Sequence, residues 1–479
     1  MHVVFREAQG LEETEIPMDL GQTPADLVVL SFSDSDLGAF SEGWKKEREG
    51  LPSLRLANLV ALKHPLSVDT YIDQTLSGAK GILIRLIGGV QYWEYGLNQV
   101  YQLAQEKGIA LAVLPADGRE DTRLDEYSTI PKSTLQRLKK LTDTGGSKAA
   151  AAALAQLAIA AGLYAAPIIG DKSLPEVGYW SLEKGVVSEF VSSKNNQVVS
   201  IIFYRSFLAS EDMAAIERLS DAFVLLGYQV VGIFSPTLKN PKYGFWVQKA
   251  IEDLQPVAII NATSFSSKGA DGYSPLDIST APIFQVALST SNRKNWVDAC
   301  RGLSPTDLAM HVVLPEVDGK IFAGIVSTKE ATKKDQNLQY SRFIHSPLEE
   351  RVNQISVKID KWIKLQTKHK KEEVPKVALV LSTYPGKKWQ MAHAVGLDAI
   401  ASAAAIATDC SLTEFDLTNI PARLENEQIL WPVASYRDAL GTLPNKLKDM
   451  LTKAWGEPED DPDVVDNCFR FPAFKEGLS

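Results

Sequence analysis

The sequence predicts an α/β protein built from successive Rossmann-like or flavodoxin-like domains with parallel sheets, the last of them incomplete. Residues 27–32, 81–86 and 109–114 are short, continuously apolar and bounded by turns or charges, as strands covered on both faces are. Segments of helical length, residues 64–76 and 92–107, lie between these strands. This β-α-β-α order predicts parallel strands that are joined by helices.

The first domain is expected to span residues 1–166 and to close with helices at 133–142 and 148–163. The second of these helices lies in an uncharged stretch that is long enough to cross a bilayer. Alanine, which dominates the stretch, supplies little transfer free energy, and Pro167 ends it. We therefore interpret it as a packed helix and expect no membrane partner.

Two further domains are expected after a linker. Residues 167–197 are rich in Pro, Gly and Ser without periodicity, which is typical of a linker or crossing segment. A second α/β domain is expected over residues 198–370, where apolar strands and amphipathic helices alternate again. A third α/β unit is expected over residues 374–479 and is interpreted as truncated, because few residues follow its last predicted strand at 469–474. The other elements predicted in this unit are strands at 377–381 and 412–415 and helices at 397–408, 435–440 and 446–455.

The composition indicates a folded, acidic protein. Apolar residues make up 45% and charged residues 23% of the 479 residues, and the formal net charge is −9. These values argue against a disordered chain and against nucleic acid as the main partner. The three cysteines are far apart in the sequence, so neither a disulfide framework nor a Cys-x-x-Cys metal motif is expected, and we predict a cytoplasmic protein.

The sequence lacks the short motifs that would identify a mechanism. It contains no Walker A loop, no G-x-G-x-x-G, no H-E-x-x-H and no G-x-S-x-G. The six histidines are isolated from one another, so a metal site would need ligands from distant segments, and its residues stay unknown.

Two local patterns are nevertheless candidates for binding. Tyr92 and Trp93 follow a predicted buried strand and Gly88-Gly89, at the end of a sheet where open α/β folds place ligands. Their rings could stack on a macrocycle, or could anchor the next helix against the sheet. Glu316 and Asp318 lie in a turn, where they could contact a metal or amides, or could simply be solvated.

At these segments the sequence resembles the large subunit of ATP-dependent cobaltochelatase (CobN), a family homologous to the H subunit of magnesium chelatase. The similar blocks are spread over nearly the whole chain. They are residues 19–26 (DLGQTPAD), 33–36 (SDSD), 55–59 (RLANL), 62–69 (LKHPLSVD), 85–89 (RLIGG), 92–96 (YWEYG), 261–263 (NAT), 301–310 (RGLSPTDLAM), 314–319 (LPEVDG), 383–386 (TYPG) and 393–398 (HAVGLD). Their order and density carry the resemblance, which is closer to the cobalt branch than to the magnesium branch.

The resemblance implies a tetrapyrrole-binding subunit of a ligase that forms nitrogen–metal bonds. The implied substrates are hydrogenobyrinic acid a,c-diamide and Co²⁺, in aerobic cobalamin synthesis. ATP and Mg²⁺ would be used by AAA+ motor subunits of the CobS and CobT type, and no cofactor is expected on this chain. The implied substrate-binding residues are Tyr92, Trp93, Glu316 and Asp318, together with His64 and His393, which lie in family-like blocks.

The sequence departs from the family in two respects. A His-Gly-x-x-Glu block, expected to carry metal insertion, is not found in residues 1–479, and His311 stands where the family pattern leads us to expect asparagine. We therefore expect an N-terminal portion of a large subunit that is inactive alone, and assign no catalytic residue. The alternatives are a non-catalytic tetrapyrrole-binding or subunit-docking scaffold, a magnesium chelatase H-type subunit, and a glycosyltransferase-like enzyme, for which no sugar-nucleotide block is seen.

Overall fold

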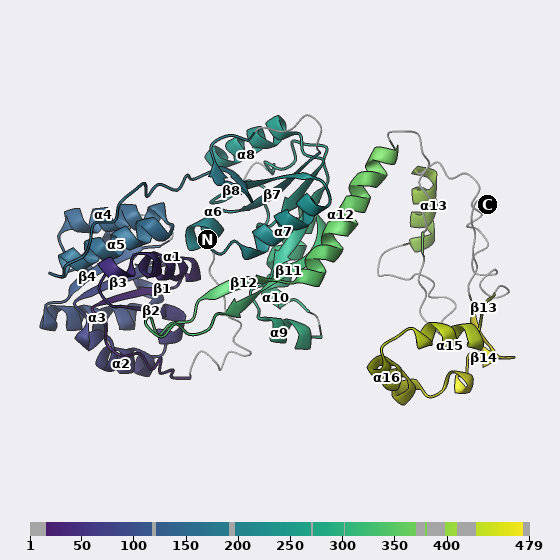
Figure 1. Cartoon of the computed structure of the whole chain (residues 1–479), viewed down its shortest axis with the longest axis horizontal. Helices are drawn as coiled ribbons and strands as arrows, with labels where there is room; N and C mark the ends of the chain where they lie inside the picture. Colours follow the sequence, from purple (N-terminus) through teal and green to yellow (C-terminus); the bar gives the residue numbers. More distant parts are fainter. Residues whose placement is uncertain are drawn as a thin grey trace. The chain divides into compact units, whose positions relative to one another are not determined.

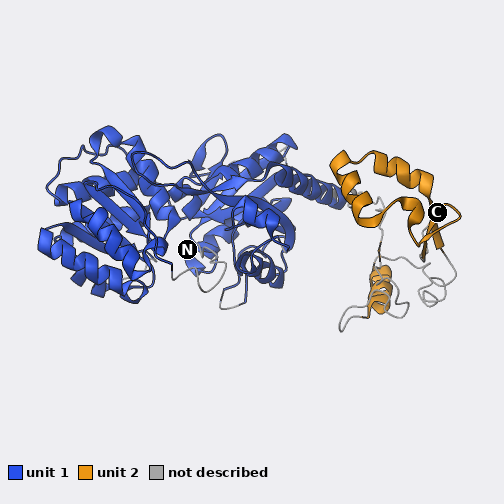
Figure 2. Cartoon of the chain, turned by 90° about the horizontal axis from the view of Figure 1, so that it is seen from below, with its two compact units in different colours: residues 1–373 blue, residues 374–479 orange. Residues whose placement is uncertain are grey.

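A computed structural model describes residues 16–116, 121–190, 197–269, 272–300, 302–369, 379–380, 398–409 and 428–472. The chain divides into two compact units, Met1–Glu373 and Val374–Ser479 (Figure 2). The division falls where the third predicted domain begins, and both larger sheets belong to the first unit (Figure 1).

The first sheet is parallel and fully buried, as predicted. Its strands run in the order β2-β1-β3-β4. Their bounds are β1 (Leu27–Ser31), β2 (Leu54–Asn58), β3 (Gly81–Leu86) and β4 (Ala110–Pro115). Three of the four were predicted, whereas β2 was missed because its sequence, LRLAN, contains an arginine and an asparagine.

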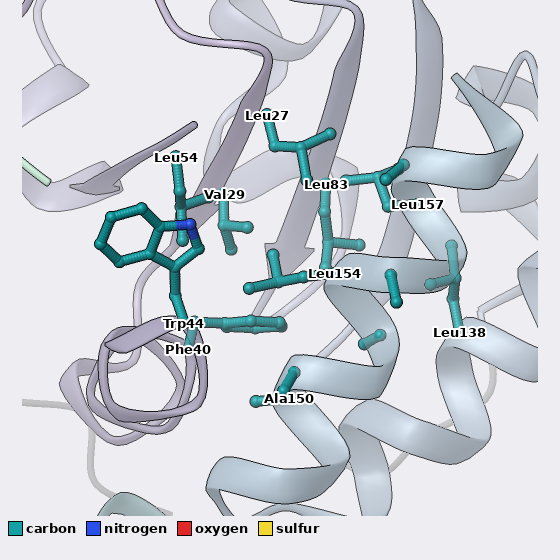
Figure 3. Close-up of a cluster of buried hydrophobic side chains, with 14 of the residues drawn as sticks. Leu27, Val29, Phe40, Trp44, Leu54, Leu83, Leu138, Ala150, Leu154 and Leu157 are labelled. Atoms are coloured by element: carbon teal, nitrogen blue, oxygen red, sulfur yellow. The ribbon is translucent and has the colours of Figure 1, made fainter. Parts of the chain in front are cut away.

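Helices cover both faces of this sheet. On one face α1 (Asp34–Lys46), α4 (Lys132–Thr144) and α5 (Ser147–Ala160) pack on side chains such as Leu27, Val29 and Leu83 (Figure 3). On the other face α2 (Pro65–Gln74) and α3 (Glu94–Lys107) pack on Val28 and Ile82. Neighbouring residues of one strand therefore face opposite cores, which explains the continuous apolar runs.

The alanine-rich segment forms the buried helix α5, as predicted. Its small side chains allow a close approach to α1: a Cβ added to Gly43 would overlap the carbonyl oxygen of Ser147. Within the described ranges, no helix combines the length and apolar character that a membrane crossing needs.

The second sheet has a parallel centre with antiparallel edges. Its order is β12-β11-β10-β9-β7-β8-β5-β6, and the five central strands are parallel. The central strands are β7 (Val198–Tyr204), β8 (Gln229–Ser235), β9 (Ala258–Asn261), β10 (Ile283–Leu288) and β11 (Ile321–Ala331). Counted along the chain, these five have the flavodoxin-type order 2-1-3-4-5. The fold class predicted from the sequence is thus confirmed.

Residues 167–197, interpreted from the sequence as a linker or crossing segment, contain two strands. β5 (Gly178–Ser181) and β6 (Gly185–Val187) form a hairpin that extends the second sheet antiparallel to β8. Trp180 of β5 is buried in the core and meets Phe203 edge-to-face, with ring centroids 6.1 Å apart. Burial of the Trp180 ring, rather than a periodic pattern of apolar residues, holds this segment against the sheet.

Helices also cover the second sheet. α7 (Ala214–Leu225) and α12 (Glu349–His369) pack on one face, and α8 (Pro241–Leu254) packs on the other. Shorter helices follow the carboxyl ends of strands: α6 (Arg205–Ser210), α9 (Arg293–Asp298), α10 (Pro305–Leu308), the π-helical turn η7 (Ala309–Val313) and α11 (Leu314–Val317).

An arm joins the two sheets. β11 and the antiparallel edge strand β12 (Phe343–Pro347) are connected by residues 332–342, which reach the first domain (Figure 1). Leu338, at the end of the arm, is fully buried in the core formed by α1, α4, α5 and the first sheet. The guanidinium of Arg55 donates to the carbonyl of Asn337 at 2.7 Å.

In the second unit, the described strands form an antiparallel sheet, which differs from the parallel unit that was expected. β13 (Gln428–Pro432) and β14 (Val464–Val465) both pair antiparallel with β15 (Cys468–Pro472). Asp466 and Asn467 link β14 to β15 with φ of 53° and 57°, as a two-residue hairpin loop requires. The turn dictates the antiparallel pairing.

The helices described in the second unit are α13 (Ala399–Asp409), α15 (Val433–Gly441) and α16 (Asn445–Trp455), close to their predicted positions. The strand predicted at 412–415 and most of that predicted at 377–381 lie outside the described residues.

Candidate functional site

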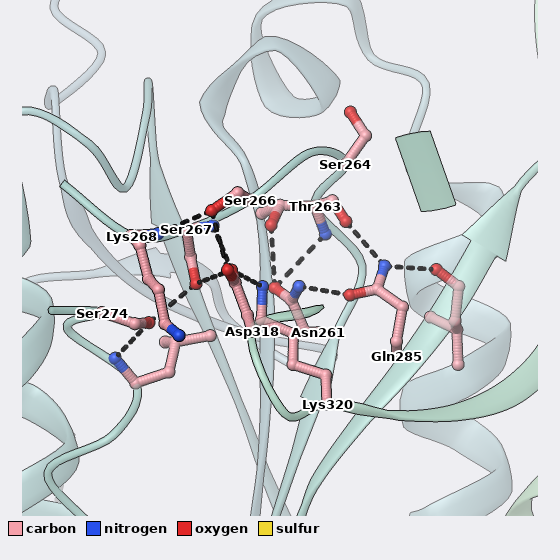
Figure 4. Close-up of polar contacts among 12 residues, drawn as sticks. Asn261, Thr263, Ser264, Ser266, Ser267, Lys268, Ser274, Gln285, Asp318 and Lys320 are labelled. Atoms are coloured by element: carbon pink, nitrogen blue, oxygen red, sulfur yellow. Dashed lines mark hydrogen bonds and ion pairs between the residues drawn. The ribbon is translucent and has the colours of Figure 1, made fainter. Parts of the chain in front are cut away.

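The candidate site lies at the carboxyl ends of β9 and β10 in the second sheet. β7 and β9 are adjacent, and the strand order reverses at this pair, which is the point where open α/β sheets bind ligands. The loop after β9 and the turn before β11 meet there in a network of polar side chains (Figure 4).

A buried amide pair fixes the carboxyl end of β9. Asn261 donates from Nδ2 to Oε1 of Gln285, in β10, at 2.6 Å. Gln285 in turn donates from Nε2 to the carbonyl of Thr263 at 2.7 Å, and the Thr263 hydroxyl donates to Oδ1 of Asn261 at 2.9 Å. The loop after β9 therefore begins at residues that side-chain hydrogen bonds hold in place.

Asp318 ties the turn before β11 to the same loop. Its carboxylate accepts from the Ser267 amide at 2.6 Å and from the Ser266 hydroxyl at 2.8 Å, and it lies 3.3 Å from Nζ of the buried Lys320. Burial alone would raise the pKa of Asp318, but these hydrogen bonds and Lys320 lower it below its ordinary value. Burial likewise lowers the pKa of Lys320, against the opposing effect of Asp318.

A second acidic residue, Asp307, organises the end of β10. Its carboxylate is fully buried and accepts from the Ser289 hydroxyl at 2.7 Å and from the Thr290 amide at 2.9 Å. Nε2 of His311 lies 4.0 Å from Asp307, and its Nδ1 is buried without a hydrogen-bond partner in the described structure. Burial lowers the pKa of His311, although Asp307 opposes this effect. His311 lies in the π-helical turn η7, a type of distortion that recurs at functional sites.

Of the residues singled out from the sequence, Asp318 belongs to this network. Glu316, which was predicted to lie in the same turn, instead lies in the short helix α11 that precedes the turn, with its side chain exposed. Tyr92, Trp93 and His64 belong to the first sheet's domain instead. His393 lies outside the described residues.

Trp93 is placed as an anchor rather than on the surface. Its side chain is buried, and its indole N–H donates to the carbonyl of Leu62 at 2.8 Å. Tyr92, in contrast, is 66% exposed, and its ring lies over Gly88, where a Cβ would overlap it. His64 caps helix α2, because its Nδ1 accepts from the Leu66 amide at 3.1 Å.

Sequence reasoning missed several members of the network: Gln285, Ser266, Ser267, Asp307 and Lys320. The signal available was the serine-rich run shortly after β9, a position that favours polar ligand contacts. In the part of the chain that the structure describes, no three His, Cys, Asp or Glu side chains are grouped as a metal site would require.

Fold and site together define a tandem α/β protein with a preorganised polar edge at a topological switch point. Comparison with known proteins identifies the family. The family model for CobN/Magnesium Chelatase matches residues 144–477. The chain therefore belongs to the CobN/Magnesium Chelatase family.

Individual relatives agree with this assignment. The aerobic cobaltochelatase subunit CobN of Sinorhizobium sp is 31% identical, and that of Pseudomonas aeruginosa 28% identical, each over all of this chain and 40% of the relative. The chloroplastic magnesium-chelatase subunit ChlH of Oryza sativa is 23% identical over 58% of this chain and 21% of its own length. The chain thus spans about two-fifths of the length of the CobN relatives.

A solved structure, the catalytic subunit of cobaltochelatase from Mycobacterium tuberculosis, has the same fold. It aligns with a TM-score of 0.57 and 22% identity over 94% of this chain and 38% of its own. The family resemblance inferred from the sequence is confirmed.

Proposed function

We propose that this chain is the tetrapyrrole-binding part of a CobN-type cobaltochelatase large subunit. The complete complex would insert Co²⁺ into hydrogenobyrinic acid a,c-diamide in the cytoplasm, with ATP and Mg²⁺ used by motor subunits of the CobS and CobT type. The observation that carries the proposal is the family match over residues 144–477, which includes the whole second sheet and its switch-point site.

The chemistry of the site is suited to orienting a substrate. Insertion of a divalent metal into a tetrapyrrole displaces two protons from ring nitrogens, so the macrocycle must be held while bases and ligands act. Glu316 offers an exposed carboxylate beside the rigid turn of Asp318, suited to accept hydrogen bonds from the amide groups of the substrate. Tyr92 offers an exposed ring at the end of the first sheet, which Trp93 anchors to the core.

The 479-residue chain is proposed to bind the tetrapyrrole without inserting the metal by itself. The rigid polar groups at the carboxyl ends of β9 and β10 support the binding role.

The test is a titration of the purified chain with hydrogenobyrinic acid a,c-diamide, followed by corrin absorbance and by quenching of its nine tryptophans. Saturable binding is expected, with weaker binding of protoporphyrin IX as the matched macrocycle of the magnesium branch. A Co²⁺ insertion assay with the motor subunits added should show no product. Absence of saturable corrin binding would refute the proposed function.

A docking scaffold is a second candidate, and the unit 374–479 favours it. Trp455 is 80% exposed beside a cavity of about 130 Å³ that is also lined by Tyr436, Leu440 and Phe469. Exposed aromatic residues of this kind are typical of protein interfaces. Co-purification with the motor subunits, in the absence of any tetrapyrrole binding, would favour this candidate.

A further inference from the structure

The loop after β9 holds an aromatic residue in an unusual backbone conformation. Phe265 has φ of 68°, in the left-handed region that disfavours side chains with a Cβ. The residue is 40% exposed, so part of its surface remains available to a ligand. Backbone strain of this kind persists only where the surrounding structure enforces it, and it is concentrated at functional sites.

The surroundings of Phe265 enforce the conformation. The Tyr204 hydroxyl donates to the carbonyl of Ser264 at 2.8 Å, and the Phe265 amide donates to the carbonyl of Met310 at 2.8 Å. On the other side, the Ser267 amide donates to Asp318 at 2.6 Å. The residue is thus fixed from both sides and cannot relax without breaking contacts to two other segments.

The position of Phe265 suits a large, flat ligand. It follows Asn261 and Thr263 at the carboxyl end of the switch-point strand β9. The Met310 carbonyl, which accepts the hydrogen bond from the Phe265 amide, belongs to the helical segment 305–317. This segment carries partly exposed apolar side chains: Leu308, Val313, Leu314 and Val317. Exposed aromatic and apolar side chains on segments that are hydrogen-bonded to each other, close in the chain to fixed polar groups, are typical of ligand sites.

We infer that Phe265 is a substrate-binding residue whose ring packs on the face of the tetrapyrrole macrocycle. The inference rests on the proposed function and assigns the contact to the second sheet. Tyr92 is also exposed, but its ring rests on Gly88 in the first domain.

Phe265→Gly provides the sharpest test, because it separates folding from binding. Glycine adopts a positive φ without strain, and this gain offsets the packing lost with the partly covered ring, so the variant should stay folded with an unfolding temperature close to that of the wild type. Loss of the ring should weaken binding of hydrogenobyrinic acid a,c-diamide by about tenfold, as measured by absorbance titration of the full chain. Phe265→Tyr, which keeps a ring of the same shape, should bind within about threefold of the wild type.

The control for loss of an exposed ring is Phe245→Ala. Alanine is used here because glycine would destabilise the helix that contains Phe245. Phe245 is 71% exposed on α8, and its loss should leave the affinity unchanged. If the wild type binds the corrin and Phe265→Gly binds it with the same affinity, the inference about Phe265 is overturned and the proposed function is not. A wild type that does not bind would overturn both the inference and the proposed function.

Discussion

Leu338→Ala should loosen the arm that joins the two sheets. Leu338 is fully buried in the core of the first domain, although it belongs to the connection between β11 and β12 of the second sheet. The substitution removes three carbon atoms, which corresponds to about 2.4 kcal/mol of transfer free energy at about 0.8 kcal/mol per carbon. The cavity that remains adds to this loss, because Leu→Ala changes in cores cost about 2 to 5 kcal/mol. We expect a loss of about 3 to 4 kcal/mol in the free energy of unfolding of the unit that contains both sheets.

Hydrogen exchange read by mass spectrometry, together with urea unfolding, measures both parts of this expectation. Exchange should rise most in residues 332–342 and in the strand that receives the arm through Arg55. Leu225→Ala, at a leucine that is 76% exposed on α7, is the matched control and should change the free energy of unfolding by less than about 0.5 kcal/mol. If Leu338→Ala cost no more than this control, the arm would not anchor the two domains.

Three further predictions concern packing and pH. Gly43→Ala should destabilise the first domain by about 1 to 3 kcal/mol in urea unfolding, since the added Cβ would overlap the Ser147 carbonyl. Asp318→Asn should cost about 1 to 3 kcal/mol at pH 7, because its donors lose a charged acceptor. Since the folded pKa of Asp318 lies below the unfolded value, this cost should shrink as the pH falls from 5 toward 3. The pKa of His311 is also lowered by folding, so its unfolded form binds more protons below pH 6.5, and wild-type stability should fall there. His311→Asn should flatten that part of the pH dependence, measured as unfolding free energies between pH 7.5 and 5.5.

The first two of these predictions have control variants, and the third has a result that would refute it. Gly441→Ala, in α15, meets nothing within 4 Å and should be neutral or slightly stabilising. Glu316→Gln, in the helix that precedes the turn, tests whether loss of a nearby exposed carboxylate gives the effect of Asp318→Asn. An equal loss of stability would contradict the role given to Asp318. An unaltered pH profile in His311→Asn would show that the buried imidazole does not titrate between the folded and unfolded states.

Much of the fold could be predicted because both sheets obey simple local rules. The strand at 81–86 was predicted to the residue, since Arg85 is the single charged residue in GILIRL and a glycine pair follows shortly after the strand ends. β2 could not be predicted in the same way, because Arg55 is buried through contacts that lie far away in the sequence. Its guanidinium donates to the carbonyls of Thr23 and Asn337. A local sequence pattern does not predict that a charged residue will form hydrogen bonds with such distant partners.

The candidate site was predictable only in part. Asp318 was placed in a turn, as found, but its partners come from a loop some 50 residues earlier in the chain, so the network around it was not visible. Trp93 illustrates the opposite problem. A tryptophan after a strand suits a stacking surface and a core anchor equally well, and the two are distinguished by the burial of its side chain and by its hydrogen bond to the Leu62 carbonyl. The strain at Phe265 has no signal in the sequence at all, because a backbone angle depends on the contacts that hold the loop.

A polar contact complements the apolar anchor between the two sheets. Asp34, just after β1, is buried; it accepts from Nδ2 of Asn58 at 2.8 Å and lies 3.4 Å from Nζ of Lys329 in β11. A buried ion pair adds little net stability, but separating its partners leaves an uncompensated charge. Leu338 therefore supplies the free energy that holds the arm, and the Asp34–Lys329 pair penalises any displacement that would part the carboxyl ends of β1 and β11. Two α/β domains that look independent in the sequence are thereby joined by an apolar contact and a polar contact, which come from the arm and from the strand β11 that precedes it.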